Sequence, residues 1–387
     1  MKKVKFFTVL IAPSLIAMAS LAHAQVKVGV IVSATGPAAA LGQPQQRLAQ
    51  TFPPTIGGQP ATYIILDDAT DANQAARAAR RLTSEDKVDV ILGPSGNLTA
   101  FPVLEIAAET KTPMITMAPA SGLTSPIDEK RSWVFKSVVD EKIVAEATVA
   151  MMKRAGVKTM GIIASSEAYG ESWVAVLPSF AAQSNVKIVA TERYGLADVT
   201  ATGQTIRLLS AKPDAILIVG ISTTAAMPHK ALRERGYTGP IYQTYGSLNN
   251  EFLKVGGRDV EGALMLATNK FLILNELPAE DPVKQRMGEV VKAFESKYGI
   301  GSAVPYIMTL SDSRTIASAA IEKSIKSGTK PGTPEFRSAL RDQIEATTSL
   351  QLTQSQITFS PTNHTNIDKA SVATFVVKNG KWTRFEE

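Results

Sequence analysis

The sequence contains no cysteine and only three histidines, and these two scarcities exclude several kinds of site. Without cysteine, the chain can form neither a disulfide nor a thiolate zinc site. After residue 24 only His229 and His364 remain, far apart and outside any H-E-x-x-H pattern. We therefore expect no metal and no other cofactor, and a stability that rests on the hydrophobic core.

Long apolar runs are also absent after the first 24 residues, so nothing later approaches the roughly 20 residues of a membrane-spanning helix. At the N-terminus, three lysines within five positions precede an apolar run from Phe6 to Leu21, and Ala22-His23-Ala24 follows. This order is typical of a secretory signal peptide. We predict cleavage after Ala24 and a mature protein located in the periplasm, with no cysteine at the cleavage site to carry a lipid.

A strong charge of either sign is lacking as well. The whole chain has a net charge of +6, and residues 1–24 carry three lysines and no acid, which leaves +3 for the rest. This small excess is scattered along the chain, whereas nucleic-acid-binding proteins concentrate basic residues on one face. We therefore expect no nucleic acid among the partners. At 387 residues the chain is long enough for two domains.

Patterns that hold phosphate or activate a nucleophile are missing too. In ILGPSGNLTAFP (91–102), Gly93 and Gly96 are three apart without a following lysine, and Ser95 lacks the G-x-S-x-G spacing. The loop either turns a strand into a helix without a ligand, or holds an anion with its backbone N–H groups. In D-D-x-x-D, residues 67–71, the aspartates either bind magnesium or cap the helix that follows, and capping is favoured.

Short apolar runs alternate with helical patterns along the chain, which predicts an α/β protein with parallel sheets covered on both faces. The predicted strands are 26–32, 62–66, 88–92, 112–117, 160–164, 186–191, 214–219, 240–245, 262–267, 356–360 and 372–377. The main predicted helices are 73–85, 98–110, 141–154, 172–183, 224–235, 282–297, 306–326 and 334–344. The strands form two clusters, parted near 135–140, so we expect two doubly wound lobes joined by a hinge.

We expect the first lobe to comprise residues 25–138 and 268–355, and the second lobe residues 139–267 and 356–387. In open α/β sheets, ligands bind beyond the carboxyl ends of the strands. Most residues at these ends are small, hydroxylated or aromatic, including Ser121 and Ser222, and none is basic. Two such rims that face each other across a hinge predict a cleft that closes around one small polar molecule.

Several stretches resemble the type I periplasmic solute-binding proteins of ABC importers, the family that binds leucine, isoleucine and valine. The resemblance covers nearly the whole chain after residue 24 and lies in 28–42, 66–82, 91–124, 167–172, 209–220 and 359–370. It implies the type I periplasmic binding protein fold, with two hinged lobes, three crossings between them and no enzymatic activity. It also implies that the protein, expected as a monomer, delivers a solute to the membrane subunits of an ABC permease.

The resemblance also implies site residues by position. Asn97 occupies the place of a serine that binds the ligand carboxylate, and Ala118 and Ala120 fall where a backbone group and a threonine hydroxyl bind it. The other matched positions carry aromatic or acidic residues in the family. They are Leu41 at an aromatic wall position, Tyr169 and Ile221 at tyrosines of the second lobe, and Tyr245 at the acid that pairs with an amino-acid ammonium.

These positions favour a small carboxylate as the ligand, and an aromatic or otherwise apolar acid in particular. An ammonium enclosed in a dry cleft needs a carboxylate partner. At the position where the family carries this acid, the present sequence has Tyr245. The amino-acid alternative remains open, because Glu167 or Glu251 could supply the acid from a neighbouring loop. A ligand-sensing regulatory domain shares the fold and is the competing class. Such domains usually continue into a membrane or signalling segment, which we do not expect of a chain that ends at Glu387.

Overall fold

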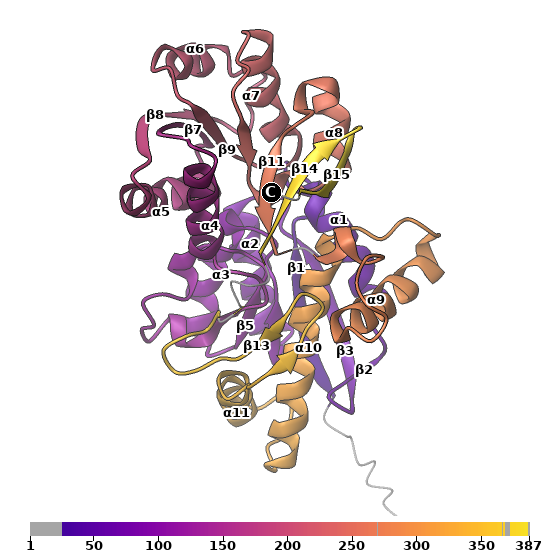
Figure 1. Cartoon of the computed structure of the whole chain (residues 1–387). Coiled ribbons are helices and arrows are strands. Elements are labelled where there is room, and N and C mark those ends of the chain that lie inside the picture. The colour runs from indigo at the N-terminus through magenta and orange to yellow at the C-terminus, as the bar shows by residue number, and fades with distance from the viewer. Residues whose placement is uncertain (1–24, 269, 366, 368–371, 386–387) are drawn as a thin grey trace, which may run out of the picture.

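The structure is a computed structural model that describes residues 25–268, 270–365, 367 and 372–385. The predicted signal peptide, residues 1–24, lies outside the described residues. Two lobes are visible in Figure 1, each built on its own sheet, with the second lobe above the first. Among the described residues, no helix combines the length and the apolar character that a membrane crossing requires.

The first lobe contains a six-stranded sheet with the strand order β2-β3-β1-β4-β5-β6. Its strands are β1 (Val26–Val32), β2 (Thr55–Ile56), β3 (Gln59–Asp67), β4 (Val90–Leu92), β5 (Met114–Thr116) and β6 (Val134–Lys136). All neighbours pair in parallel except β2 and β3. A tight turn through Gly57 and Gly58 joins those two strands, and so short a connection can only make antiparallel neighbours.

Helices cover both faces of this sheet, as the alternating side chains of β1 require. Val28 and Val30 pack on one side, whereas Ile31 packs on the other. The first side is covered by α1 (Ala39–Ala49), α9 (Pro282–Tyr298), α10 (Tyr306–Lys326) and α11 (Pro334–Glu345), and the second by α2 (Ala72–Arg80) and α3 (Asn97–Glu109).

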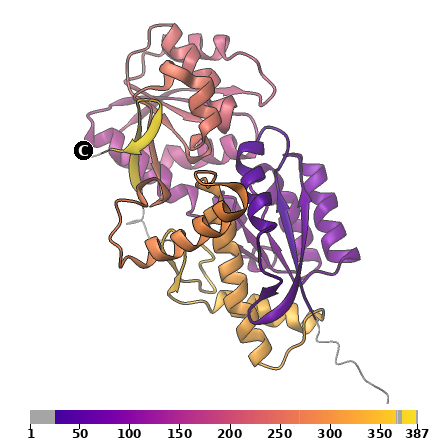
Figure 2. The ribbon, with the colours of Figure 1, turned by 90° about the vertical axis from the view of Figure 1, so that its right-hand side faces the viewer.

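The second lobe contains a seven-stranded sheet with the order β15-β14-β11-β10-β9-β7-β8. Its strands are β7 (Thr159–Ser165), β8 (Lys187–Tyr194), β9 (Ala215–Val219), β10 (Ile241–Gln243), β11 (Leu264–Ala267), β14 (Ala373–Lys378) and β15 (Lys381–Arg384). One face is covered by α4 (Glu141–Arg154) and α5 (Ala168–Ser184), and the other by α6 (Thr202–Ser210), α7 (Ser222–Glu234) and α8 (Asn250–Gly256). Figure 2 shows the yellow β14–β15 hairpin at the edge of this lobe.

The predicted class, an α/β protein of two doubly wound lobes, is confirmed, although both sheets are mixed rather than purely parallel. In the second sheet β14 and β15 run antiparallel, because the turn at Asn379 and Gly380 joins them as a hairpin. These edge strands return from the C-terminal part of the chain. The other five strands of this sheet pair in parallel, so their carboxyl ends still lie along the edge that faces the other lobe.

Residues 356–359 lie in a different lobe from the one that we expected. We expected residues 356–387 in the second lobe, but β13 (Gln356–Ile357) pairs with β12 (Leu350–Gln351), and Ile357 and Phe359 pack in the core of the first lobe. The ring of Phe359 lies 5.3 Å from that of Phe135. An apolar alternation predicts a strand, but it does not say which sheet or which core receives it.

Candidate functional site

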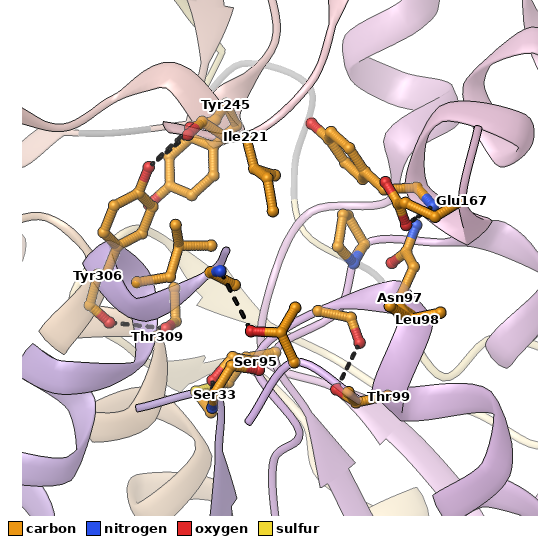
Figure 3. A pocket seen from close by; sticks show the side chains of 18 of the residues that line it. Ser33, Ser95, Asn97, Leu98, Thr99, Glu167, Ile221, Tyr245, Tyr306 and Thr309 are labelled. Atoms are coloured by element: carbon orange, nitrogen blue, oxygen red, sulfur yellow. Dashed lines mark hydrogen bonds between the residues drawn. The ribbon is translucent and has the colours of Figure 1, made fainter. Parts of the chain in front are cut away.

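Clefts between domains are common places for small-molecule sites. A cavity of this kind lies between the two lobes and includes about 700 Å³ of empty space, part of it open to solvent. In Figure 3, Ser33, Ser95 and Thr99 lie at its base, Ile221 and Tyr245 lie opposite them, and Asn97 and Glu167 close one side. Its lining comes from strand ends and helix starts of both lobes. The lining residues are Ser33, Ala38, Leu41, Gln45, Thr70, Ser95, Gly96, Asn97, Leu98, Thr99, Met117, Pro119, Glu167, Tyr169, Leu196, Ile221, Tyr245, Gly246, Tyr306 and Thr309.

Polar side chains at the base of the cavity are joined in a chain of hydrogen bonds. The Ser33 N–H donates to Ser95 Oγ at 3.2 Å, and this hydroxyl donates to Gln45 Oε1 at 2.6 Å. Gln45 Nε2 then donates to Thr309 Oγ1 at 3.0 Å. Because Gln45 lies on α1 and Thr309 on α10, this chain fixes two helices against the ends of the strands. It leaves the base polar but without net charge.

Two helices begin at this cavity without a side-chain cap. Helix α3 begins after Gly96, which makes no side-chain cap hydrogen bond, and residues 96–99 all line the cavity. Helix α7 begins after Ile221, again without a side-chain cap bond, and Ile221 lines the cavity from the second lobe. The first N–H groups of a helix lack intrahelical acceptors and carry partial positive charge, so both ends favour an anion.

Glu167 is the one acidic residue among those that line the cavity, and none of the lining residues is basic. It caps α5: its Oε2 accepts from the Tyr169 N–H at 2.7 Å and its Oε1 accepts from Ser165 Oγ at 2.7 Å. Burial raises the pKa of Glu167, and these hydrogen bonds oppose the rise. The cavity therefore combines two uncapped helix starts, a feature that favours an anion, with one acid among its described lining residues, which caps a third helix.

Three tyrosines give the cavity its aromatic surface. Tyr169 starts α5, Tyr245 follows β10, and Tyr306 is the first residue of α10. The rings of Tyr245 and Tyr306 meet edge to face with centroids 5.4 Å apart, and the Tyr306 hydroxyl donates to the Tyr245 carbonyl at 3.0 Å. Tyr306 thus ties the helix of the first lobe to a loop of the second.

Five of the nine predicted site residues line the cavity: Leu41, Asn97, Tyr169, Ile221 and Tyr245. The other four do not. Ala118 and Ala120 are buried in the core between α3 and the sheet, where Thr116 Oγ1 accepts from the N–H of Ala118 and Asn97 Oδ1 from that of Ala120. Ser121 donates from its hydroxyl to Asp140, and Ser222 donates to Asn249 Oδ1 at 3.3 Å.

Asn97 itself bonds to protein groups at both ends of its amide. Oδ1 accepts from the Ala120 N–H at 3.1 Å, and Nδ2 donates to Ser172 Oγ at 3.1 Å. Because Ser172 lies on α5 of the second lobe, this bond crosses the cleft. Asn97 therefore occupies the predicted position, but its side chain joins the lobes in this structure.

Gln45, Tyr306 and Thr309 also shape the cavity, although they are not among the predicted site residues. Helix α10 was predicted with its observed bounds, yet a helical pattern does not say which turn faces another lobe. Gln45 offered a signal, because it is a polar residue on the side of α1 that otherwise carries glycine, leucine and alanine. In the structure this side is buried, and Gln45 is 2% exposed. Of the aspartates at 67–71, Asp71 caps α2 as expected and accepts from the Gln74 N–H. Asp67 and Asp68 instead accept from the N–H groups of Ala34 and Thr70.

Comparisons with known proteins agree with this architecture. Residues 25–381 match the sequence profile of the family described as periplasmic binding protein. The Leu/Ile/Val-binding protein BraC3 of Rhizobium johnstonii is 26% identical over 250 residues, covering 62% of this chain and 67% of the relative.

The chain is also similar to solved structures. An extracellular ligand-binding receptor from Rhodopseudomonas palustris HaA2 is 41% identical and superposes with a TM-score of 0.88, covering 94% of this chain and 100% of that one. The branched-chain amino acid transporter substrate-binding protein LivJ from Streptococcus pneumoniae, in complex with isoleucine, has a TM-score of 0.76 at 17% identity, covering 92% and 97%. At that identity the likeness concerns the fold alone.

Proposed function

Because the chain belongs to the periplasmic binding protein family, whose members bind solutes and are not enzymes, we propose that it captures a small carboxylate with an apolar body. The observation that carries the proposal is the pair of uncapped helix starts, α3 and α7, which meet at an apolar cavity without any basic side chain. Such helix ends hold a carboxylate through backbone N–H groups. The apolar walls then receive the rest of the solute.

Two candidates differ in whether the solute also carries an amine. The relatives named as Leu/Ile/Val-binding proteins support a branched-chain amino acid, with Glu167 as the partner of its ammonium. The lining supports an aromatic or other apolar acid without an amine, since both oxygens of Glu167 already accept hydrogen bonds and Tyr169 and Tyr245 offer ring faces.

The same reasoning assigns the chain a role in transport. The solute-binding subunit of an ABC importer takes up its ligand in the periplasm and delivers it to permease subunits in the membrane, which we propose as the partners. Residues 1–24 would direct export and be removed. An intact mass that begins at Gln25 in the exported protein supports this step, whereas a chain that retains Met1 contradicts it.

Thermal shift with matched ligands tests the proposal. Leucine, isoleucine and valine represent the first candidate, and benzoate and cinnamate represent the second. A ligand at about 100 times its Kd stabilises the native state by about 2.7 kcal/mol, which raises Tm by several degrees. The neutral amide of each acid that binds is the control. We expect the amides to lose the shift, and an amide that binds as tightly as its acid would contradict the carboxylate site.

Small-angle scattering tests the closing cleft independently. A solute that bridges the two rims favours the closed arrangement of the lobes, so we expect a smaller radius of gyration when it is bound. The acid that gives the largest thermal shift is used at saturation, and its amide is the control. An unchanged profile with a bound acid would remove the closing step and leave the binding proposal standing.

A further inference from the structure

A second cavity lies between the lobes beside the segments that connect them, and its empty space of about 570 Å³ is partly open to solvent. Its lining includes Val138 and Val139 from the segment between β6 and α4, and Thr268 from the end of β11. Five residues line this cavity and the first one alike: Met117, Pro119, Tyr169, Tyr245 and Thr309. The two cavities are therefore neighbours, and the second extends the solute site toward the hinge.

Two buried hydrogen-bond donors that line the second cavity have no acceptor among the described residues. They are Trp173 Nε1 on α5 and Gln354 Nε2, in side chains that are 2% and 7% exposed. The orientation of the Gln354 amide follows from its other end, because Oε1 accepts from the Lys270 N–H at 3.1 Å. A buried donor without a partner destabilises a fold, so two of them on one cavity indicate a group that accepts both.

The remaining polar groups of the cavity define what kind of acceptor fits. Glu141 is the one acidic residue among the described residues that line it, and its oxygens accept from the Ser121 N–H at 3.0 Å and from Ser172 Oγ at 2.7 Å. None of the described residues that line the cavity is basic. A second carboxylate would be buried there without a basic side chain in the described lining, which is costly, whereas a neutral oxygen that accepts hydrogen bonds avoids that cost.

We propose that the solute is elongated and carries, at the end opposite its carboxylate, a neutral oxygen that accepts hydrogen bonds from Trp173 and Gln354 in the second cavity. A hydroxyl or a carbonyl oxygen satisfies this description. The inference rests on the proposed function, since the carboxylate at α3 fixes which end of the solute reaches inward. It adds a specificity site that leucine, isoleucine and valine do not use, because their side chains carry no oxygen.

Two pairs of acids that differ only in a terminal hydroxyl test the inference by calorimetry. Cinnamate and 4-hydroxycinnamate lack an amine, and phenylalanine and tyrosine carry one, so the far oxygen and the amine are tested separately. A site built around buried donors rejects an analogue that leaves them unpaired. In the pair that binds, we expect the hydroxylated member to bind at least about tenfold more tightly.

Variants that remove each donor and keep its shape assign this preference to the second cavity. In Trp173→Phe and in Gln354→Leu we expect the preference for the hydroxylated acid to fall severalfold, with little change for the acid that lacks the hydroxyl. Trp382→Phe is the control, because its Nε1 donates to the Ser247 carbonyl outside both cavities. If Trp173→Phe does not fold, Gln354→Leu carries the test.

Each outcome separates the inference from the proposed function. Equal binding of both members of a pair, a preference that both variants retain, or binding of leucine, isoleucine and valine alone would overturn the inference and leave the carboxylate site in place. If none of the acids, including those three, binds the unmodified protein, the proposed function fails and the inference fails with it.

Discussion

Asn97 Nδ2 lies 3.1 Å from Ser172 Oγ, and this hydrogen bond joins the first turn of α3 in the first lobe to α5 in the second lobe. Ser172 in turn donates to Glu141 Oε2 at 2.7 Å, and Glu141 Oε1 accepts from the Ser121 N–H. The group that the family pattern assigns to the ligand is thus also part of a buried contact between lobes. Under the proposed function, this side chain would couple binding of the solute to closing of the lobes.

Comparing Ser172→Ala with Asn97→Ala separates these two roles. Ser172→Ala removes the bond between lobes and retains the bond from Ala120 to Asn97, so we expect solute affinity to fall by about fivefold as the closed form loses about 1 kcal/mol. Asn97→Ala loses in addition any direct contact with the solute. It also leaves the buried Ala120 N–H unpaired, which costs about 1–3 kcal/mol of folding stability.

Calorimetry with the best acid measures the affinities, and urea denaturation measures the free energies of unfolding. A larger affinity loss in Asn97→Ala than in Ser172→Ala indicates direct contact with the solute. Equal losses would restrict Asn97 to the contact between lobes. Unchanged affinity in Ser172→Ala would mean that the bond across the cleft does not stabilise the closed form.

Gly170 provides a prediction about how α5 is positioned. An ideal Cβ at Gly170 would lie 1.8 Å from the Ser165 carbonyl oxygen, so only glycine allows α5 to pack this closely on β7. We expect Gly170→Ala to displace the start of α5, which carries Glu167 and Tyr169, and to destabilise the fold by about 1–3 kcal/mol. Solute affinity should fall as well, because both displaced residues line the cavity.

The matched control is Gly288→Ala in α9, where a Cβ would meet no atom within 4 Å. Alanine is the better helix former, so this variant should gain about 0.5–1 kcal/mol in the free energy of unfolding and keep its affinity. Urea denaturation and calorimetry on both variants check the pair. A Gly170→Ala protein as stable as the unmodified one would show that α5 can move without cost.

The sequence predicted the layered fold well because parallel strands buried on both faces leave continuous apolar runs. The bounds of β1, α4 and α10 agree with the prediction, and each element has a strong local signal. The site was predicted only in part, because its geometry depends on partners from distant segments. Tyr306 lines the cavity from a helix that follows β11, and Ala118 lies under α3 although its neighbour Met117 lines the cavity.

Lys136 illustrates why such features escape a pattern. It is fully buried at the end of β6, where its Nζ donates to Asp140 Oδ2 at 2.5 Å and to the Ala120 carbonyl at 2.9 Å. The sequence shows only a lysine followed four residues later by an aspartate. Lys136 and Asp140 are buried because the segment between them, which connects β6 of the first lobe to α4 of the second, packs between the lobes.

Replacing this lysine should therefore be costly. Lys136→Met leaves the buried Asp140 charge without its cationic partner, and we expect a loss of about 3–5 kcal/mol in the free energy of unfolding. Lys136→Met with Asp140→Asn should recover part of it, because asparagine removes the charge and can still cap α4 through its contact with the Lys142 N–H. Denaturation of both variants is the measurement. A double variant no more stable than the single one would contradict the charge argument.

Glu141 gives the last prediction, a pH dependence with a defined sign. Burial raises the pKa of Glu141 to about 7, against its hydrogen bonds from Ser121 and Ser172 and the attraction of Lys136. Below pH 4.5, the ordinary value, Glu141 is protonated whether the chain is folded or unfolded, and the group contributes no pH dependence. Between pH 4.5 and about 7 only the folded chain holds the proton, so the free energy of unfolding falls as pH rises. The total loss is about 3 kcal/mol, complete above pH 7.

Glu141→Gln removes this titration and keeps an oxygen that can accept from the Ser121 N–H. Relative to its own value at pH 4.5, the variant should therefore be about 3 kcal/mol more stable at pH 8 than the unmodified protein. Glu322→Gln is the control. A hydrogen bond from Lys326 holds the pKa of that exposed carboxyl below its usual range, so its difference curve should have the opposite sign and a smaller amplitude. Urea denaturation from pH 4.5 to 8 gives both curves. A flat difference between Glu141→Gln and the unmodified protein would mean that folding does not raise the pKa of Glu141.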